Sequence, residues 1–296
     1  MGRRLVAIAF ATTALLGAAP KAHQVQIQGD RLAYVASGRG PPVVFVHGGF
    51  QDYRMWLAHV PVFAERYRVI AYSRRNHFPN SSTPSGTPDS AADVHGDDLA
   101  ELITRLHLGP VNVVAHSAGA HAALMFAARH PELLRSLVIV EPPASGMLTN
   151  SPEDTKAGEG FRNRLAPALE SLAVGDAQRG TKLFADAVGG PGTYDGRTAE
   201  QKAMMADNVA AHIADATTKR ARPRFDCAMA SHIRAPVLII SGIHSPEYFH
   251  RIVAHLTTCL PNSRVRLINA SHTVPNEAPA AFDRAALEFL KAQPRR

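Results

Sequence analysis

Residues 111–121 have the sequence VNVVAHSAGAH. A β-branched run ends at Ser117, and small helix-forming residues follow it. A serine on a sharp turn from strand to helix needs small residues two positions before and after it, because the strained turn brings backbone close to backbone. Ala115 and Gly119 occupy these positions. The stretch therefore predicts a nucleophilic serine at the end of a buried strand, in preference to an ordinary helix N-cap.

Short apolar runs without alternation recur along the chain, as expected for parallel strands buried on both faces. These runs are 43–46, 69–71, 111–115, 137–140 and 237–240, with helical patterns such as 97–106 and 121–128 between them. An alternating segment, 23–37, contains a Gly-Asp turn and predicts an antiparallel hairpin before the other strands. The order of elements predicts an α/β fold with a doubly wound, mostly parallel sheet.

The alternation of strands and helices is interrupted once. Between Ala144 and about Arg224 only helical patterns occur, at 161–172, 180–188 and 200–214. An insertion of this size is expected to cover the carboxyl edge of the sheet, where ligands bind in open α/β folds. We therefore expect residues 23–143 and 226–296 to form the core and residues 144–225 to form a helical lid.

The first residues have the pattern of a secretory signal peptide. Two arginines precede a mainly apolar run, 5–16, which small residues follow. The run is shorter than the roughly 20 apolar residues that a spanning helix needs, so we expect no stable membrane insertion. We expect residues 1–22 to be removed by cleavage after Ala19 or Ala22, and the mature protein to be periplasmic or secreted.

Composition is that of a compact globular chain. Of 296 residues, 46% are hydrophobic and 19% charged, which differs from the composition of disordered chains and membrane bundles. The net charge is +7, but the densest basic group, 219–224, has no interleaved aromatic residue, so we expect no nucleic-acid partner. The two cysteines, Cys227 and Cys259, fit either one disulfide or two buried thiols. The sequence does not indicate the oligomeric state.

From Val43 almost to the C-terminus the chain resembles the α/β-hydrolase fold family, as a serine hydrolase with a helical lid. The residues His47-Gly48-Gly49, which follow the run 43–46, are similar to the family's oxyanion loop. The resemblance implies that Gly49, or its neighbour Phe50, and Ala118 supply backbone N–H groups to an oxyanion. We place Phe50, Trp56 and His116 at the substrate site.

The resemblance also identifies a candidate base, His272. It lies in the segment Asn269-Ala270-Ser271-His272, between a strand-like run at 265–268 and a helical pattern at 279–290. This is the position of the family's late histidine loop. The chain order of serine, acid and histidine is kept as well.

The acid is the least obvious member of the predicted triad. In most of the family it follows the strand written here as 237–240, but the loop after this strand has no aspartate, and Ser245 stands in the usual place. Glu141 ends the preceding strand, from which some relatives, notably certain haloalkane dehalogenases, supply their acid. We predict Glu141 as the acid, with Glu247 as the alternative.

These residues imply a two-step acyl transfer without a metal or an organic cofactor. The expected substrate is a small carboxylic ester, lactone or thioester. A serine nucleophile argues against haloalkane dehalogenase and epoxide hydrolase chemistry, in which a carboxylate forms an alkyl ester. Carbon–carbon bond hydrolysis of a diketone and cofactor-free perhydrolysis remain alternatives within the fold. A non-catalytic ligand receptor is the alternative of another class.

Overall fold

The computed structural model describes residues 21–80, 91–217 and 224–293. Its centre is an eight-stranded sheet with the order β1-β2-β4-β3-β5-β6-β7-β8. The predicted hairpin is confirmed, because β1 (Ala22–Ile27) pairs antiparallel with β2 (Asp30–Ser37). The strand β2 is also antiparallel to β4, and β3 to β8 run parallel to one another. The predicted doubly wound, mostly parallel sheet is thus confirmed.

The parallel strands are short and rich in β-branched residues. Their bounds are Pro42–Val46 (β3), Arg68–Tyr72 (β4), Val111–His116 (β5), Leu134–Val140 (β6), Val237–Gly242 (β7) and Ser263–Ile268 (β8). Every residue of β5 and β7 is buried, whereas most of β8, at the edge of the sheet, is exposed. Burial on both faces explains why the central strands show no alternation of polar and apolar residues.

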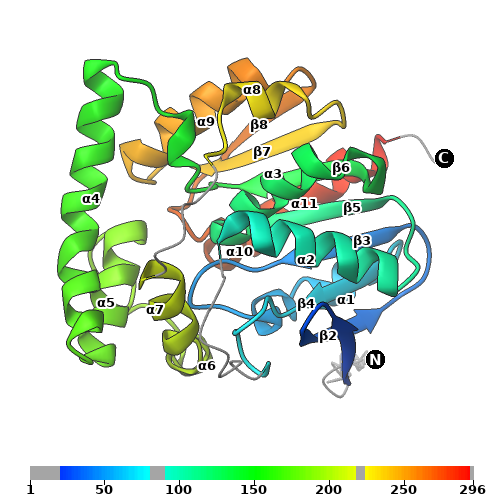
Figure 1. Cartoon of the computed structure of the whole chain (residues 1–296), viewed down its shortest axis with the longest axis horizontal. Helices are drawn as coiled ribbons and strands as arrows, with labels where there is room; N and C mark the ends of the chain where they lie inside the picture. Colours follow the sequence, from blue (N-terminus) through cyan, green and yellow to red (C-terminus); the bar gives the residue numbers. More distant parts are fainter. Residues whose placement is uncertain (1–20, 81–90, 218–223, 294–296) are drawn as a thin grey trace, which may run out of the picture.

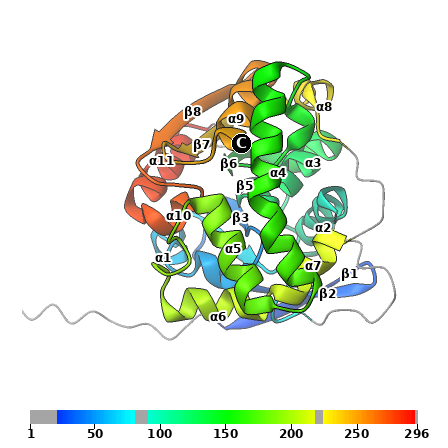
Figure 2. The ribbon, with the colours of Figure 1, turned by 90° about the vertical axis from the view of Figure 1, so that its left-hand side faces the viewer.

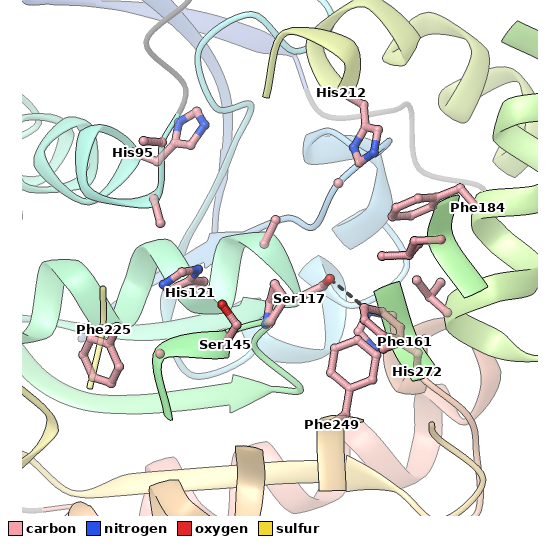
Figure 3. Close-up of a pocket in the computed structure, with 18 of the residues that line it drawn as sticks. His95, Ser117, His121, Ser145, Phe161, Phe184, His212, Phe225, Phe249 and His272 are labelled. Carbon is pink, nitrogen blue, oxygen red and sulfur yellow. Dashed lines mark hydrogen bonds between the residues drawn. The ribbon is translucent and has the colours of Figure 1, made fainter. Parts of the chain in front are cut away.

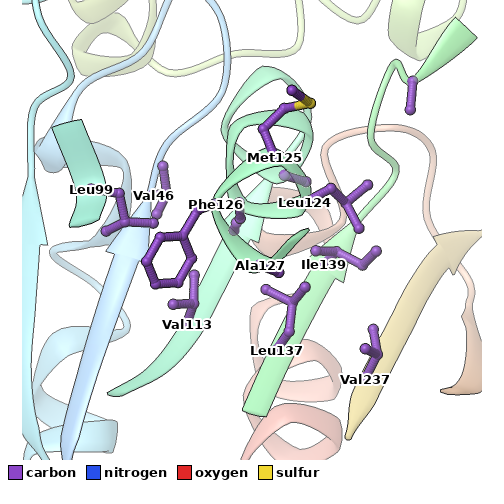
Figure 4. Packing of buried hydrophobic residues seen from close by; sticks show 14 of the residues in the cluster. Val46, Leu99, Val113, Leu124, Met125, Phe126, Ala127, Leu137, Ile139 and Val237 are labelled. Carbon is purple, nitrogen blue, oxygen red and sulfur yellow. The ribbon is translucent and has the colours of Figure 1, made fainter. Parts of the chain in front are cut away.

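Helices cover both faces of the sheet (Figure 1). One apolar core joins the sheet to α2, α3 and α9, and a second core joins it to α1 and α11. Figure 4 shows Leu99 of α2, Phe126 of α3 and Val113 of β5 within the first of these layers. The helices of the core are α1 (Val60–Ala64), α2 (Ala92–Arg105), α3 (Ala118–Arg129), α8 (Cys227–Ser231), α9 (Glu247–Cys259), α10 (Val274–Glu277) and α11 (Pro279–Lys291), with 3-10 turns at Tyr53–Trp56, Pro131–Leu133 and Ser145–Met147.

Between β6 and β7 the described part of the chain forms helices and no strand. Figure 2 shows these helices side by side in front of the sheet. They are α4 (Pro152–Ala173), α5 (Ala177–Gly189), α6 (Ala199–Asp207) and α7 (Val209–Thr217). Helices α4 and α5 share a cavity wall with residues that follow β3, β5 and β8, so the insertion covers the carboxyl edge of the sheet. We keep 144–225 as the proposed extent of the lid.

The helical pattern over 200–214 corresponds to two helices, α6 and α7, because the chain leaves helical geometry at Asn208. Asn208 is fully buried, and its Nδ2 donates to Asp52 Oδ2 at 2.7 Å. Its Oδ1 accepts the backbone N–H of Phe78 at 2.8 Å. These bonds tie the lid to loops that follow β3 and β4, and the backbone of Asn208 leaves helical geometry to make them.

Cys227 of α8 and Cys259 of α9 form a disulfide, which decides between the two alternatives that the sequence left open.

The expected signal peptide lies outside the described residues apart from its last two positions, and the second of these, Ala22, is the first residue of β1. No helix in the described ranges is both long and apolar enough to span a bilayer.

Candidate active site

Ser117 lies on the turn between β5 and α3. Its backbone has φ 52° and ψ −122°, a conformation that residues with a side chain rarely adopt. Close packing holds this strained turn in place. A Cβ at Gly119 would lie 2.3 Å from the carbonyl oxygen of His47, so only glycine lets α3 approach the loop after β3. The predicted strand-to-helix turn is therefore present, with the Ser117 side chain in the wall of a cavity.

The structure brings together Ser117, His272 and Glu141 (Figure 3 shows the first two). His272 Nε2 lies 2.9 Å from Ser117 Oγ, and His272 Nδ1 lies 2.8 Å from Glu141 Oε2. In this arrangement the serine hydroxyl donates to Nε2, and the Nδ1–H group donates to the carboxylate. Such a chain can take the serine proton and stabilise the imidazolium that forms.

Glu141 is fully buried and has a positive φ of 45° at the end of β6. Its Oε1 accepts the hydroxyl of Ser241 and the backbone N–H of Gly242, both at 2.8 Å. Both donors stand at the end of β7, the strand from which most of the family supplies the acid. In this chain β7 supplies hydrogen-bond donors to an acid from the neighbouring strand.

The alternative acid, Glu247, lies elsewhere. It is the first residue of α9, and its side chain is 68% exposed. The Nδ1 of His250 lies 3.9 Å from Glu247 Oε2. The geometry therefore favours Glu141 over Glu247 as the partner of His272.

The ring of His272 lies close to two other rings. Phe249 stacks on it with the ring centroids 4.1 Å apart, and the centroid of His116 lies 5.1 Å away. Burial, together with the neighbouring His272, lowers the pKa of His116 well below its usual value. The neutral His116 ring can donate its Nε2–H group to the backbone oxygen of His272 at 3.0 Å. His116, predicted at the substrate site, thus also holds the loop of the base.

Gly49 lines the cavity together with Ser117 and Ala118. Ala118 is the first residue of α3, so its N–H group has no acceptor within the helix. Both residues predicted to supply an oxyanion site therefore stand beside Ser117. Gly48 is confined as well, since a Cβ there would lie 2.7 Å from Gln51 Oε1 and 2.8 Å from His116 Nδ1.

The structure contradicts the placement of Trp56 at the substrate site. Its side chain is fully buried in the core, stacked on Phe45 with ring centroids 4.8 Å apart and 5.9 Å from Phe282. Nearness in sequence to the oxyanion loop does not fix the direction of a side chain, and the 3-10 turn at Tyr53–Trp56 carries this one into the core. Phe50 is also buried and does not line the cavity; its ring packs against Phe184 and His212 of the lid.

The cavity over Ser117 has a volume of about 430 Å³. Figure 3 shows Ser117 between His95 and His121 on one side and Phe161 and Phe184 on the other. The apolar part of the wall includes Phe161, Leu165, Leu169, Phe184, Val188 and Phe249, and the polar part includes Asp93, His95, His121 and Ser145. Sequence analysis missed the polar group, because one histidine among 15 carries no signal without its neighbours in space.

A family model for the alpha/beta hydrolase fold matches residues 41–279, and the chain belongs to this family. A protein of Mycobacterium tuberculosis named "Putative non-heme bromoperoxidase BpoC" is 29% identical over 286 residues, which cover 88% of this chain and 97% of that protein. The (E)-2-((N-methylformamido)methylene)succinate hydrolase of Acinetobacter baylyi is 23% identical, over 91% of this chain and 98% of that protein. The solved structure of the esterase RhEst1 from Rhodococcus has the same fold, with a TM-score of 0.73 and 20% identity over 94% of this chain and all of that one.

Proposed function

We propose that this protein is a serine hydrolase that cleaves a carboxylic ester, lactone or thioester through an acyl-enzyme. The observation that carries the proposal is the hydrogen-bonded chain from Ser117 Oγ through His272 to a buried Glu141. A hydroxyl at a strained turn, an oriented imidazole and a carboxylate whose other oxygen is also hydrogen-bonded are the groups that nucleophilic acyl transfer requires.

In the first step His272 Nε2 takes the proton of Ser117 as Oγ attacks the carbonyl carbon. The oxyanion that forms accepts hydrogen bonds from the N–H groups of Gly49 and Ala118. His272 then gives its proton to the leaving oxygen or sulfur, and the acyl group stays on Ser117. In the second step a water molecule attacks the acyl-enzyme with the same base, and the acid product leaves. Glu141 keeps the proton on Nδ1 throughout and stabilises the cation.

A panel of p-nitrophenyl esters of increasing chain length tests this proposal with the mature protein. Ser117→Ala should lower kcat by a factor of about 10⁴ or more while the protein stays folded, because the nucleophile is lost. A fluorophosphonate reagent should label the wild type and not this variant. An active Ser117→Ala enzyme would refute the proposal. A folded wild type that turns over none of the esters would favour a ligand receptor.

The name of the mycobacterial relative favours a second candidate, cofactor-free perhydrolysis. Hydrogen peroxide would take the place of water in the second step, and the acyl group would leave as a peracid. The peracid would then oxidise bromide and be reduced to the carboxylic acid. Bromination of monochlorodimedone that needs acetate, peroxide, bromide and Ser117 together would support this activity. Bromination that persists in Ser117→Ala would exclude it.

A further inference from the structure

A second, smaller hollow adjoins the catalytic residues. Its volume is about 20 Å³, and its wall includes Ser117, His272 and Gly49. Arg197, from the lid segment between α5 and α6, is also part of this wall. The same side chain borders an outer groove of about 470 Å³ between the lid and the loop of the base. Arg197 thus stands between the catalytic residues and the outer surface.

The guanidinium of Arg197 is a cation without a hydrogen-bond acceptor among the residues that the structure describes. Its Nε is fully buried and unbonded. Burial lowers the pKa of Arg197, but a guanidinium stays charged in proteins. A buried N–H group of a charged side chain costs free energy when no acceptor is present, so this position is suited to an acceptor brought by a ligand.

The two carboxylates that act on Arg197 electrostatically are already engaged elsewhere. Asp186 accepts the backbone N–H of Tyr194 at 2.9 Å and pairs with Lys182 at 3.4 Å. Glu277 accepts hydrogen bonds from the backbone and hydroxyl groups of Ser271 and Thr273. Their charges offset part of the cost of the half-buried cation but form no hydrogen bond with its donors.

The backbone around Arg197 is fixed on both sides. Its N–H group donates to the carbonyl of Tyr194 at 3.1 Å. The next residue, Thr198, is the N-cap of α6 in a reciprocal capping box with Gln201. Because the turn is held before any ligand arrives, little backbone entropy would be lost when the guanidinium binds an anion.

We propose that Arg197 binds a carboxylate that the substrate carries close to its scissile carbonyl. The inference rests on the proposed acyl transfer at Ser117. The planar guanidinium matches a carboxylate in shape as well as in charge. A hollow of about 20 Å³ holds one or two water-sized groups, so it suits a compact carboxylate and excludes a ring or an alkyl chain. The substrate class is a short ester of a dicarboxylic acid, or an ester of a short hydroxy acid.

Two pairs of isosteric esters test the proposal. The first pair is 4-nitrophenyl hemisuccinate and 4-nitrophenyl 4-methylpentanoate, in which an isopropyl group replaces the carboxylate on the acyl side. The second pair is O-acetylglycolate and isobutyl acetate, which differ in the same way on the alcohol side. The readout is the ratio of kcat/KM between the anionic and the neutral member of each pair, which a purely structural arginine would not change.

In at least one pair, Arg197→Met should lower this ratio by a factor of about 10 to 100, the value of a hydrogen bond to a charged group. Arg197→Lys should keep part of the ratio, because it keeps the charge without the planar fork. Arg179→Met is the matched control, since Arg179 is exposed on α5 and lines neither the cavity over Ser117 nor the smaller hollow. This variant should leave kcat/KM unchanged for all four substrates.

Ratios that stay the same in Arg197→Met for both pairs would overturn the assignment of Arg197. A wild type that turns over no ester would instead refute the proposed function. In that case calorimetry that measures the binding of succinate and of O-acetylglycolate tests whether Arg197 forms a carboxylate site. Binding of either anion that Arg197→Met abolishes would support the carboxylate site, and no binding by the wild type would overturn it.

Discussion

Glu141 and Ser241 show how one site is shared between two neighbouring strands. The carboxylate of Glu141 receives hydrogen bonds from His272, Ser241 and Gly242, so both of its oxygens are satisfied in a site closed to water. A buried carboxylate is tolerated under such conditions, and its charge remains available to an imidazolium. The serine in β7 and the glutamate after β6 therefore depend on each other.

The first prediction concerns this acid. Glu141→Gln keeps the shape of the side chain but removes the charge that stabilises the imidazolium, so kcat should fall by about 10⁴. Glu247→Gln is the control: Glu247 is exposed, so this variant should have nearly the kcat of the wild type. Steady-state kinetics with a p-nitrophenyl ester and thermal unfolding of both variants make the measurement. Full activity in Glu141→Gln, or a crippled Glu247→Gln, would contradict the assignment.

Sequence reasoning at this scale succeeds where the chemistry is local. Ser117 and His272 lie in motifs whose neighbours identify them, and Glu141 follows from the missing aspartate after β7. Trp56 shows the limit, because the direction of its side chain depends on how it packs against Phe45 of β3 and Phe282 of α11, which the local sequence does not show. Arg197 was missed for the same reason, since its place beside the hollow follows from the packing of the lid.

At the scale of elements, one buried carboxylate joins the lid to the core. Asp154, in the first turn of α4, accepts Arg251 Nε at 2.6 Å and lies 2.7 Å from His255 Nε2, both on α9. It also accepts the backbone N–H and the hydroxyl of Thr149. Helix α4 is thus attached at its N-terminus to the helix that supplies Phe249 to the active site.

The second prediction concerns the pH dependence of this attachment. Burial alone would raise the pKa of Asp154, but the hydrogen bonds from Thr149, Arg251 and His255 outweigh it and hold the pKa well below its usual range. The folded state therefore binds fewer protons than the unfolded state at low pH. The stabilisation by Asp154 is fully present above the unfolded pKa, about 3.9, and is lost as the pH falls below it.

Asp154→Asn should consequently lower the free energy of unfolding at pH 7 by about 1.5 to 3 kcal/mol, the range for hydrogen bonds to a charged group. It should also flatten the fall in stability between about pH 4 and pH 2. Urea unfolding across this range makes the measurement, with Glu153→Gln as the control because its exposed side chain neighbours Asp154 in sequence. A variant with the stability and pH profile of the wild type would contradict this role.

Periodicity predicted most of the elements, because buried strands and amphipathic helices carry their pattern in a short window. It did not show the break at Asn208, where hydrogen bonds to Asp52 and Phe78 separate α6 from α7. A residue with a polar amide is compatible with a helix interior, and only its distant partners make it a break. For the same reason the sequence could not decide between a disulfide and two thiols, because the answer depends on the relative positions of α8 and α9.

At the scale of the whole molecule, the disulfide joins residues 32 apart, one at the start of α8 and one at the end of α9. In the loop-entropy account, closing a loop of this length destabilises the unfolded chain by about 3 to 4 kcal/mol. The third prediction is that Cys227→Ser with Cys259→Ser lowers the free energy of unfolding by this amount in urea. Reduced wild type should match the double variant, and equal stability of the oxidised and reduced proteins would refute the contribution.

The last prediction links this disulfide to the proposed export of the chain. Disulfides persist in oxidising compartments and are rare in the cytoplasm, so the Cys227–Cys259 bond supports a periplasmic or secreted location. The N-terminal pattern leads to the same proposal. Cleavage after Ala19 would leave β1 whole, and cleavage after Ala22 would remove only its first, exposed residue, so either product should fold.

Cell fractionation and intact-mass measurement of the recovered protein should therefore find a chain that begins after Ala19 or Ala22. Its cysteines should react with an alkylating reagent only after reduction. A variant with Arg3 and Arg4 changed to glutamate should accumulate uncleaved in the cytoplasm, where its two thiols should react at once. Wild-type protein found in the cytoplasm with residues 5–16 still attached would refute export and remove the reason to expect the disulfide in the cell.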